Sequence, residues 1–267
     1  MKILTNSILF SIILLALNTQ AHVPFLKPNQ FKVVHSRLQI ESSFTEFPFQ
    51  ADFAMDSPGY TLVTPDGEQL ALVPHAQTSA AEYLEPTLNE NGTYRVNASV
   101  RKGPRYKAIE TADGKLYFAD DMKEKLGNPT FLQYYSCADT YLYKEQPDYQ
   151  PKPLNKGLEI VPLTSPNRVR LNHEITFRVY REGKPVPNAR IVVAYDNEQY
   201  RHKRIEDLYD VENVRESNIF ADANGEFSFC PDHTGLVLLF VNVHKKVNDS
   251  LWESYNTSLT LEVNLPQ

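Results

Sequence analysis

Short stretches in which apolar and polar residues alternate recur along this chain, with turn signals about every ten residues between them. An alternation with a period of two places the apolar side chains on one face of a strand, whereas a helix needs a period near 3.6. Many short strands between frequent turns are typical of β-sandwiches. The chain also has 15 Tyr and 14 Phe, residue types that favour strands. We therefore predict an all-β protein of antiparallel, Ig-like β-sandwiches.

The individual elements can be placed from the same pattern. We expect a first strand near residues 31–40, and paired strands around turns that contain Gly and Pro, Asp or Asn. These turns lie at residues 65–67, 91–92, 113–114, 183–185 and 222–225. Between Tyr195 and Phe220 the charged, Gly-free residues 196–219 predict a long loop with at most one helical turn.

The first 21 residues have the composition of a secretory signal peptide. Lys2 is followed by an apolar run at residues 8–17, and the segment ends in Ala21. The run is shorter than the roughly 20 apolar residues that a membrane-spanning helix needs. We predict that residues 1–21 are removed on export and that the mature chain begins with His22.

A Pro-rich segment divides the rest of the chain. Residues 144–157 contain Pro147, Pro151 and Pro153, which cannot donate to a β-ladder and favour an extended linker. We place a domain boundary here, with an N-terminal β-sandwich domain at 22–152 and a C-terminal one at 153–267.

The composition excludes several functions. A net charge of −6 argues against nucleic-acid binding. The sequence has no Gly-rich phosphate loop, nucleophile elbow or His-Glu-x-x-His motif, so we expect no enzymatic activity of these kinds. Cys137 and Cys230 leave two alternatives open, one disulfide or two separate thiols.

Two histidines are candidate metal ligands. As a mature N-terminal residue, His22 offers both its α-amine and its imidazole to one ion, and such nitrogens suit Cu, Ni and Zn. The alternative is that His22 merely follows the cleavage site. His244 ends an apolar strand, on the face opposite Val241 and Val243. It is either a ligand at the end of a sheet or a half-buried strand histidine.

Several motifs resemble those of the NikM-like family (domain of unknown function 4198). In the second half they are a Glu-Ile-Val-Pro-Leu strand, a Gly-Lys-Pro-Val turn, an Asp-Ala-Asn-Gly turn and a Trp-Glu-Ser run, at residues 159–163, 183–186, 222–225 and 252–254. In the first half the Ala-His opening matches at residues 21–22, and Glu46 stands where some members have a His. The resemblance implies a periplasmic protein with two β-sandwich domains, the second similar to transthyretin-like and carboxypeptidase-regulatory modules. It also matches His22 and His244 to histidines that members of the family have.

The resemblance also implies a role in the uptake of nickel, cobalt or related metals. From it we predict a periplasmic, non-enzymatic accessory protein that binds one transition-metal ion (Ni, Co, Zn or Cu) or its chelate. The expected ligands are His22, His244 and Glu46, and the expected partner is a metal transporter or outer-membrane receptor. Two alternatives stay open: a copper brace at the N-terminal histidine that supports oxidative chemistry, and an Ig-like adhesion module that binds no metal.

Overall fold

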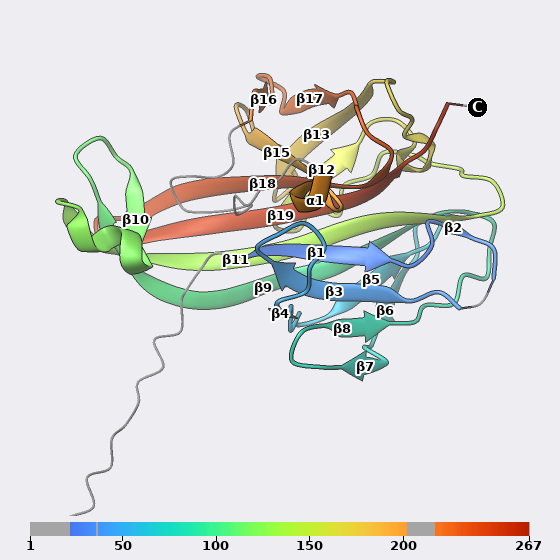
Figure 1. The fold of residues 1–267 in the computed structure, drawn as a ribbon, viewed down its shortest axis with the longest axis horizontal. Helices are drawn as coiled ribbons and strands as arrows, with labels where there is room; N and C mark the ends of the chain where they lie inside the picture. Colours follow the sequence, from blue (N-terminus) through green and yellow to red (C-terminus); the bar gives the residue numbers. More distant parts are fainter. Residues whose placement is uncertain (1–21, 36, 202–216, 267) are drawn as a thin grey trace, which may run out of the picture.

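A ten-stranded sheet forms the middle layer of the protein, and a smaller sheet packs on each of its faces (Figure 1). The structure is a computed structural model that describes residues 22–35, 37–201 and 217–266. Most of the strand pairs are antiparallel, and the prediction of an all-β, antiparallel sandwich fold is confirmed. No helix in the described part of the chain is long and apolar enough to cross a membrane.

The central sheet contains strands from both halves of the sequence. Its order is β16 (Ile219–Phe220), β15 (Arg190–Tyr195), β18 (Gly235–Asn248), β19 (Leu251–Val263), β11 (Asn128–Lys144), β9 (Gly92–Glu110), β5 (Tyr60–Val63) and β6 (Gln69–Leu72). In addition, β10 (Leu116–Phe118) pairs with β9, and β2 (Lys32–Val33) pairs with β11. The two halves join where β11 and β19 pair in parallel, from Phe131 opposite Leu251 to Thr140 opposite Thr260.

The two outer sheets come one from each half. The N-terminal sheet has the order β1 (Val23–Pro28), β3 (Ile40–Thr45), β8 (Glu82–Leu84) and β7 (Ala76–Gln77), with β4 (Phe53–Ala54) also paired to β3. The C-terminal sheet has the order β12 (Leu158–Pro162), β13 (Ile175–Arg181) and β14 (Lys184–Pro185), with β17 (Glu226–Phe229) also paired to β13. Three short helices complete the described structure: η1 (Ala119–Glu124), η2 (Pro166–Arg168) and α1 (Glu198–Arg201).

Strand alternation explains how one sheet serves both sandwiches. On β18, Leu239 and Val241 face the C-terminal sheet, whereas Leu238 and Phe240 face the side on which β1 packs. The first face packs against Phe177 and its neighbours, and all these side chains are buried. On the opposite face β1 contacts both β11 and β19, so the first strand of the described structure covers the junction of the two halves.

Three of the five predicted turns lie between strands, at residues 65–67, 113–114 and 222–225. At the other two, the strands reach into the predicted turn, because Gly92 begins β9 and Lys184–Pro185 form β14. The predicted linker also has no strand between Lys144 and Leu158. The domain boundary near residue 152 stays a prediction. The helical turn expected after Tyr195 is α1, and most of the predicted 196–219 loop lies outside the described residues.

The strand predicted near residues 31–40 is present only in part: Lys32 and Val33 form β2, and the next strand, β3, begins at Ile40. Before Ile40 the side chain of Asn29 donates to the Arg37 carbonyl oxygen at 2.9 Å and accepts from the Gln39 amide at 3.0 Å. Such side-chain contacts compete with a β-ladder. The strand that the sequence hides is β1, which contains Pro24 and Pro28. Proline is tolerated in β1 because this strand lies at the edge of its sheet, where a residue need not donate to a second neighbouring strand.

Candidate functional site

His22 precedes β1 directly, and the pairing of β1 with β3 decides what it meets. Val23 lies opposite Thr45, so one further step along this antiparallel register places His22 opposite Glu46. The imidazole Nε2 of His22 lies 3.2 Å from Oε1 of Glu46. The two predicted ligands, one just before β1 and one just after β3, are therefore neighbours at the same end of the pair.

A second carboxylate lies beside this pair. The chain turns back after β3 through β4, and Asp52 precedes β4. Its Oδ2 lies 3.8 Å from Nε2 of His22 and accepts the backbone N–H of Glu46 at 2.6 Å. The sequence analysis missed Asp52, because only the β3–β4 register brings it to Glu46.

The His22 ring is largely enclosed, with 11% of its side chain exposed, whereas Glu46 retains 23%. Phe53 of β4 contacts the ring edge-to-face, with centroids 4.6 Å apart, and Phe53 in turn stacks on Phe44 at 4.9 Å. These rings hold the imidazole in one place, so its contact with Glu46 is built into the packing of β3 and β4.

His22 also lines a cavity of about 150 Å³ between the start of β1 and the central sheet. The other residues around it come from β3, β4, β9 and β11: Phe44, Phe53, Arg101, Gly103, Pro104, Tyr106, Tyr134 and Ser136. The cavity thus combines aromatic rings, hydroxyl groups and one guanidinium next to the His22–Glu46 pair.

His244 lies on the same face of the central sheet, farther from this cavity. It pairs with Ser254 of β19, which pairs with Tyr134 of β11, a cavity residue. At about 4.8 Å per strand, the backbones of His244 and Tyr134 are roughly 10 Å apart. Burial lowers the pKa of His244 to about 4, so its imidazole is neutral near pH 7. Its role as a ligand stays a prediction.

The donor set at His22 can be tested against a metal ion. Within the described ranges, no group of three or more His, Cys, Asp or Glu residues is arranged to hold one ion. The contact between His22 and Glu46 is of a kind found at metal sites, because histidines that bind metals commonly donate their other ring N–H to a carboxylate. Nε2 is turned to Glu46, and Nδ1 is the ring nitrogen that can form a chelate ring with the α-amine that removal of residues 1–21 would create. The His22–Glu46 geometry therefore fits an N-terminal chelate in which Glu46 orients the ring.

The two cysteines have different environments, and neither forms a disulfide. The Cys137 thiol is buried and donates to the Leu158 carbonyl oxygen at 3.0 Å, whereas Cys230 is exposed. Of the two alternatives that the sequence leaves open, the structure has separate thiols.

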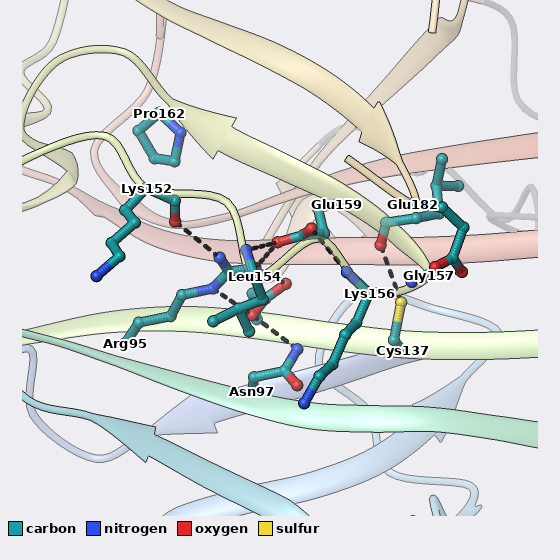
Figure 2. Close-up of polar contacts among 12 residues, drawn as sticks. Arg95, Asn97, Cys137, Lys152, Leu154, Lys156, Gly157, Glu159, Pro162 and Glu182 are labelled. Carbon is teal, nitrogen blue, oxygen red and sulfur yellow. Dashed lines mark hydrogen bonds and ion pairs between the residues drawn. The ribbon is translucent and has the colours of Figure 1, made fainter. Parts of the chain in front are cut away.

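A buried ionic cluster lies on the other face of the central sheet (Figure 2). Arg95 of β9 donates through Nε and Nη2 to both carboxylate oxygens of Asp139 at 2.7 and 2.8 Å, and through Nη2 to Glu159 at 2.9 Å. Glu159 also accepts the backbone N–H of Leu154 at 2.8 Å. Burial acts to lower the pKa of Arg95, but the Asp139 and Glu159 charges raise it well above its usual value. The cluster joins β9, β11, β12 and the linker, and we assign it a structural role.

Comparison with known proteins identifies the family. The model of the family described as "Domain of unknown function (DUF4198)" matches residues 19–245. The chain belongs to this family. No curated protein matches the chain.

Three solved structures are among those similar to the chain. They are a tetra-tandem repeat in the extending region of a large adhesion protein (10% identity, TM-score 0.23), the D00-D0 domain of Intimin (10%, 0.21) and Sidekick-1 immunoglobulin domains 1–4 (12%, 0.17). The alignments cover 90%, 90% and 92% of this chain, and 49%, 99% and 49% of the respective structures. The chain thus spans about half the length of the first and third. These scores are too low to carry an argument about function.

Proposed function

We propose that this DUF4198 protein is an exported, periplasmic protein that binds one transition-metal ion at its mature N-terminus and passes it to a metal transporter or outer-membrane receptor. The observation that carries the proposal is the 3.2 Å contact of His22 Nε2 with Glu46 Oε1. It lies at the residue that signal-peptide removal would make the N-terminus.

The chemistry follows from the two nitrogens of His22. Removal of residues 1–21 converts the His22 backbone nitrogen from an amide, which is a poor donor, into an amine with a lone pair. The amine and Nδ1 then form a chelate ring, and nitrogen donors suit Ni, Cu, Zn and Co. Glu46 fixes the tautomer with Nε2 protonated, and the charges of Glu46 and Asp52 favour a nearby cation.

The proposal is tested with two versions of the protein, one beginning with His22 and one with a single Gly ahead of it. Mass spectrometry verifies each N-terminus, and calorimetric titration with Ni, Co, Zn and Cu gives the affinities. We expect the extra Gly to weaken binding by about 10²–10⁴-fold, because it removes one arm of a two-point chelate. In the correctly processed protein, Glu46→Gln should cost about 10–100-fold, and Glu68→Gln at an exposed position should cost nothing. Equal affinity in the two N-terminal versions would overturn the proposal.

A second candidate function is favoured by the tyrosines of the same cavity. Tyr106 and Tyr134 line the space next to His22, and a copper brace that supports oxidation needs a Tyr beside its N-terminal histidine. Tight and selective Cu binding with peroxide-dependent turnover would favour this enzyme over the accessory protein. Binding of no metal by either version would favour an adhesion module.

A further inference from the structure

Arg101 shares the cavity with His22, which is unexpected for a site that takes a bare cation. A guanidinium is always protonated and repels a metal ion nearby. Its Cζ lies 5.5 Å from the centre of the Phe44 ring. Among the described residues, no carboxylate lies within ion-pair distance of Arg101. The cavity therefore presents a positive charge that no carboxylate in the described part of the chain pairs with.

Arg101 and His22 stand at the two ends of a row of rings. Arg101 lies over Phe44, Phe44 stacks on Phe53, and Phe53 contacts His22 edge-to-face. An occupant that follows this wall meets the His22 imidazole, which contacts Glu46 and Asp52, at one end and the Arg101 guanidinium at the other. It would need a metal ion at the first end and an anionic group at the second.

The formal charges of the side chains around His22 also indicate a metal ion together with an anionic group. The carboxylates of Glu46 and Asp52 and the guanidinium of Arg101 together leave one negative charge, and the neutral form of His22 adds none. A divalent ion changes this to one positive charge, so the site together with its ion attracts an anionic group. Charge compensation of this kind matters in a partly enclosed site, where solvent screens poorly.

We infer that the ligand is a transition-metal ion already held by a small carboxylate chelator, and that Arg101 binds a carboxylate arm of this chelator. The inference rests on the proposed function and adds the chemical class of the cargo. Arg101 presents paired N–H donors that match a carboxylate, and the rings of Phe44 and Phe53 provide an apolar wall for the carbon skeleton of the chelator.

The experiment uses the processed protein and three forms of one metal: nickel aqua ion, nickel citrate, and nickel bound to diethylenetriamine, a chelator without carboxylates. The variants are Arg101→Gln, Arg101→Lys and the matched control Arg105→Gln, an exposed arginine on the other face of β9. Calorimetry measures affinity, native mass spectrometry measures whether citrate is retained with nickel, and circular dichroism checks the fold.

We expect wild type to bind nickel citrate with one citrate retained per ion, and at least about tenfold more tightly than the triamine complex. Arg101→Gln should weaken nickel citrate binding about 10–100-fold, the value of a charge-assisted hydrogen-bond pair, and should leave the aqua ion bound equally or more tightly. Arg101→Lys should recover part of the loss, and Arg105→Gln should match wild type.

Three results would overturn the inference: removal of nickel from citrate with no citrate retained, equal binding of the citrate and triamine complexes, or an equal loss of aqua ion and citrate complex in Arg101→Gln. The last would mean that Arg101 acts only through its packing on Phe44. If the wild-type protein binds nickel in none of the three forms, the result differs from all three of these outcomes. It contradicts the proposed metal-binding function itself.

Discussion

At the scale of single residues, burial sets the chemistry of the two cysteines. Cys137 lies beneath the first strand of the C-terminal sheet, where burial raises the pKa of its thiol to about 12. Cys230 follows β17 and is exposed. Because the thiolate is the reactive form, the two side chains should differ greatly in reactivity although neither is bonded to the other.

We predict that a maleimide at pH 8 labels Cys230 within minutes and leaves Cys137 unlabelled until the protein is unfolded in urea. Mass spectrometry after proteolysis locates the label, and Cys230→Ser should abolish the fast reaction. Recovery of a Cys137–Cys230 disulfide peptide from the untreated protein would contradict the prediction.

The His22–Glu46 contact belongs to the same scale, and the sequence indicated both residues separately. A family resemblance and a predicted cleavage site pointed to them, but neither shows that the two side chains meet. Asp52 and Arg101 carried no signal in the sequence, because a lone carboxylate and a lone arginine in a strand-rich chain look like solvated surface.

At the scale of elements, the turn that leads from the linker into β12 depends on one glycine. Gly157 has a φ of +64°, a conformation that is strained for residues with a Cβ. A Cβ built there would lie 2.4 Å from Cγ2 of Val100 on β9, so the linker crosses the central sheet with no room for a side chain. Its amide also donates to Oε1 of Glu182 at 2.9 Å.

We predict that Gly157→Ala lowers the free energy of unfolding by about 2–4 kcal/mol, the sum of left-handed backbone strain and overpacking. Gly114→Ala is the matched control. Gly114 has a φ of +81° with no atom within 4 Å of its added Cβ, so it should lose only the backbone part, about 1–2 kcal/mol. Urea denaturation measures both, and equal losses would show that Val100 moves aside at no cost.

At the scale of the whole molecule, the buried cluster around Arg95 ties the two halves together. Arg95 and Asp139 come from the first half and Glu159 from the second, and 4%, 1% and 1% of their side chains are exposed. Ionic groups that are buried this deeply depend on one another, because removing one partner leaves the others charged and without compensation. The parallel pairing of β11 with β19 makes the same connection through the backbone.

We expect Arg95→Met to lower the free energy of unfolding by about 3–5 kcal/mol, because it leaves two carboxylates buried without their cation. The exposed Arg105→Met on the same strand should change it by no more than about 0.5 kcal/mol. Chemical denaturation followed by circular dichroism and by the fluorescence of the single Trp252 checks this in both variants. Losses of similar size in the two would mean that the cluster contributes nothing beyond an ordinary surface contact.

The sequence by itself determined the all-β class, the paired strands and their turns, and the extended linker, because alternation and turn chemistry are properties of neighbouring residues. It also indicated His22 as the residue at which the mature chain would begin. Only the tertiary structure decided that β1 is a strand despite its prolines, that both halves share one central sheet, that Glu46 and Asp52 lie beside His22, and that Arg101 lines the same cavity. These features depend on strand register and on contacts between residues far apart in the chain. A period of two fixes which face a side chain occupies, and it carries no information about which strand lies opposite.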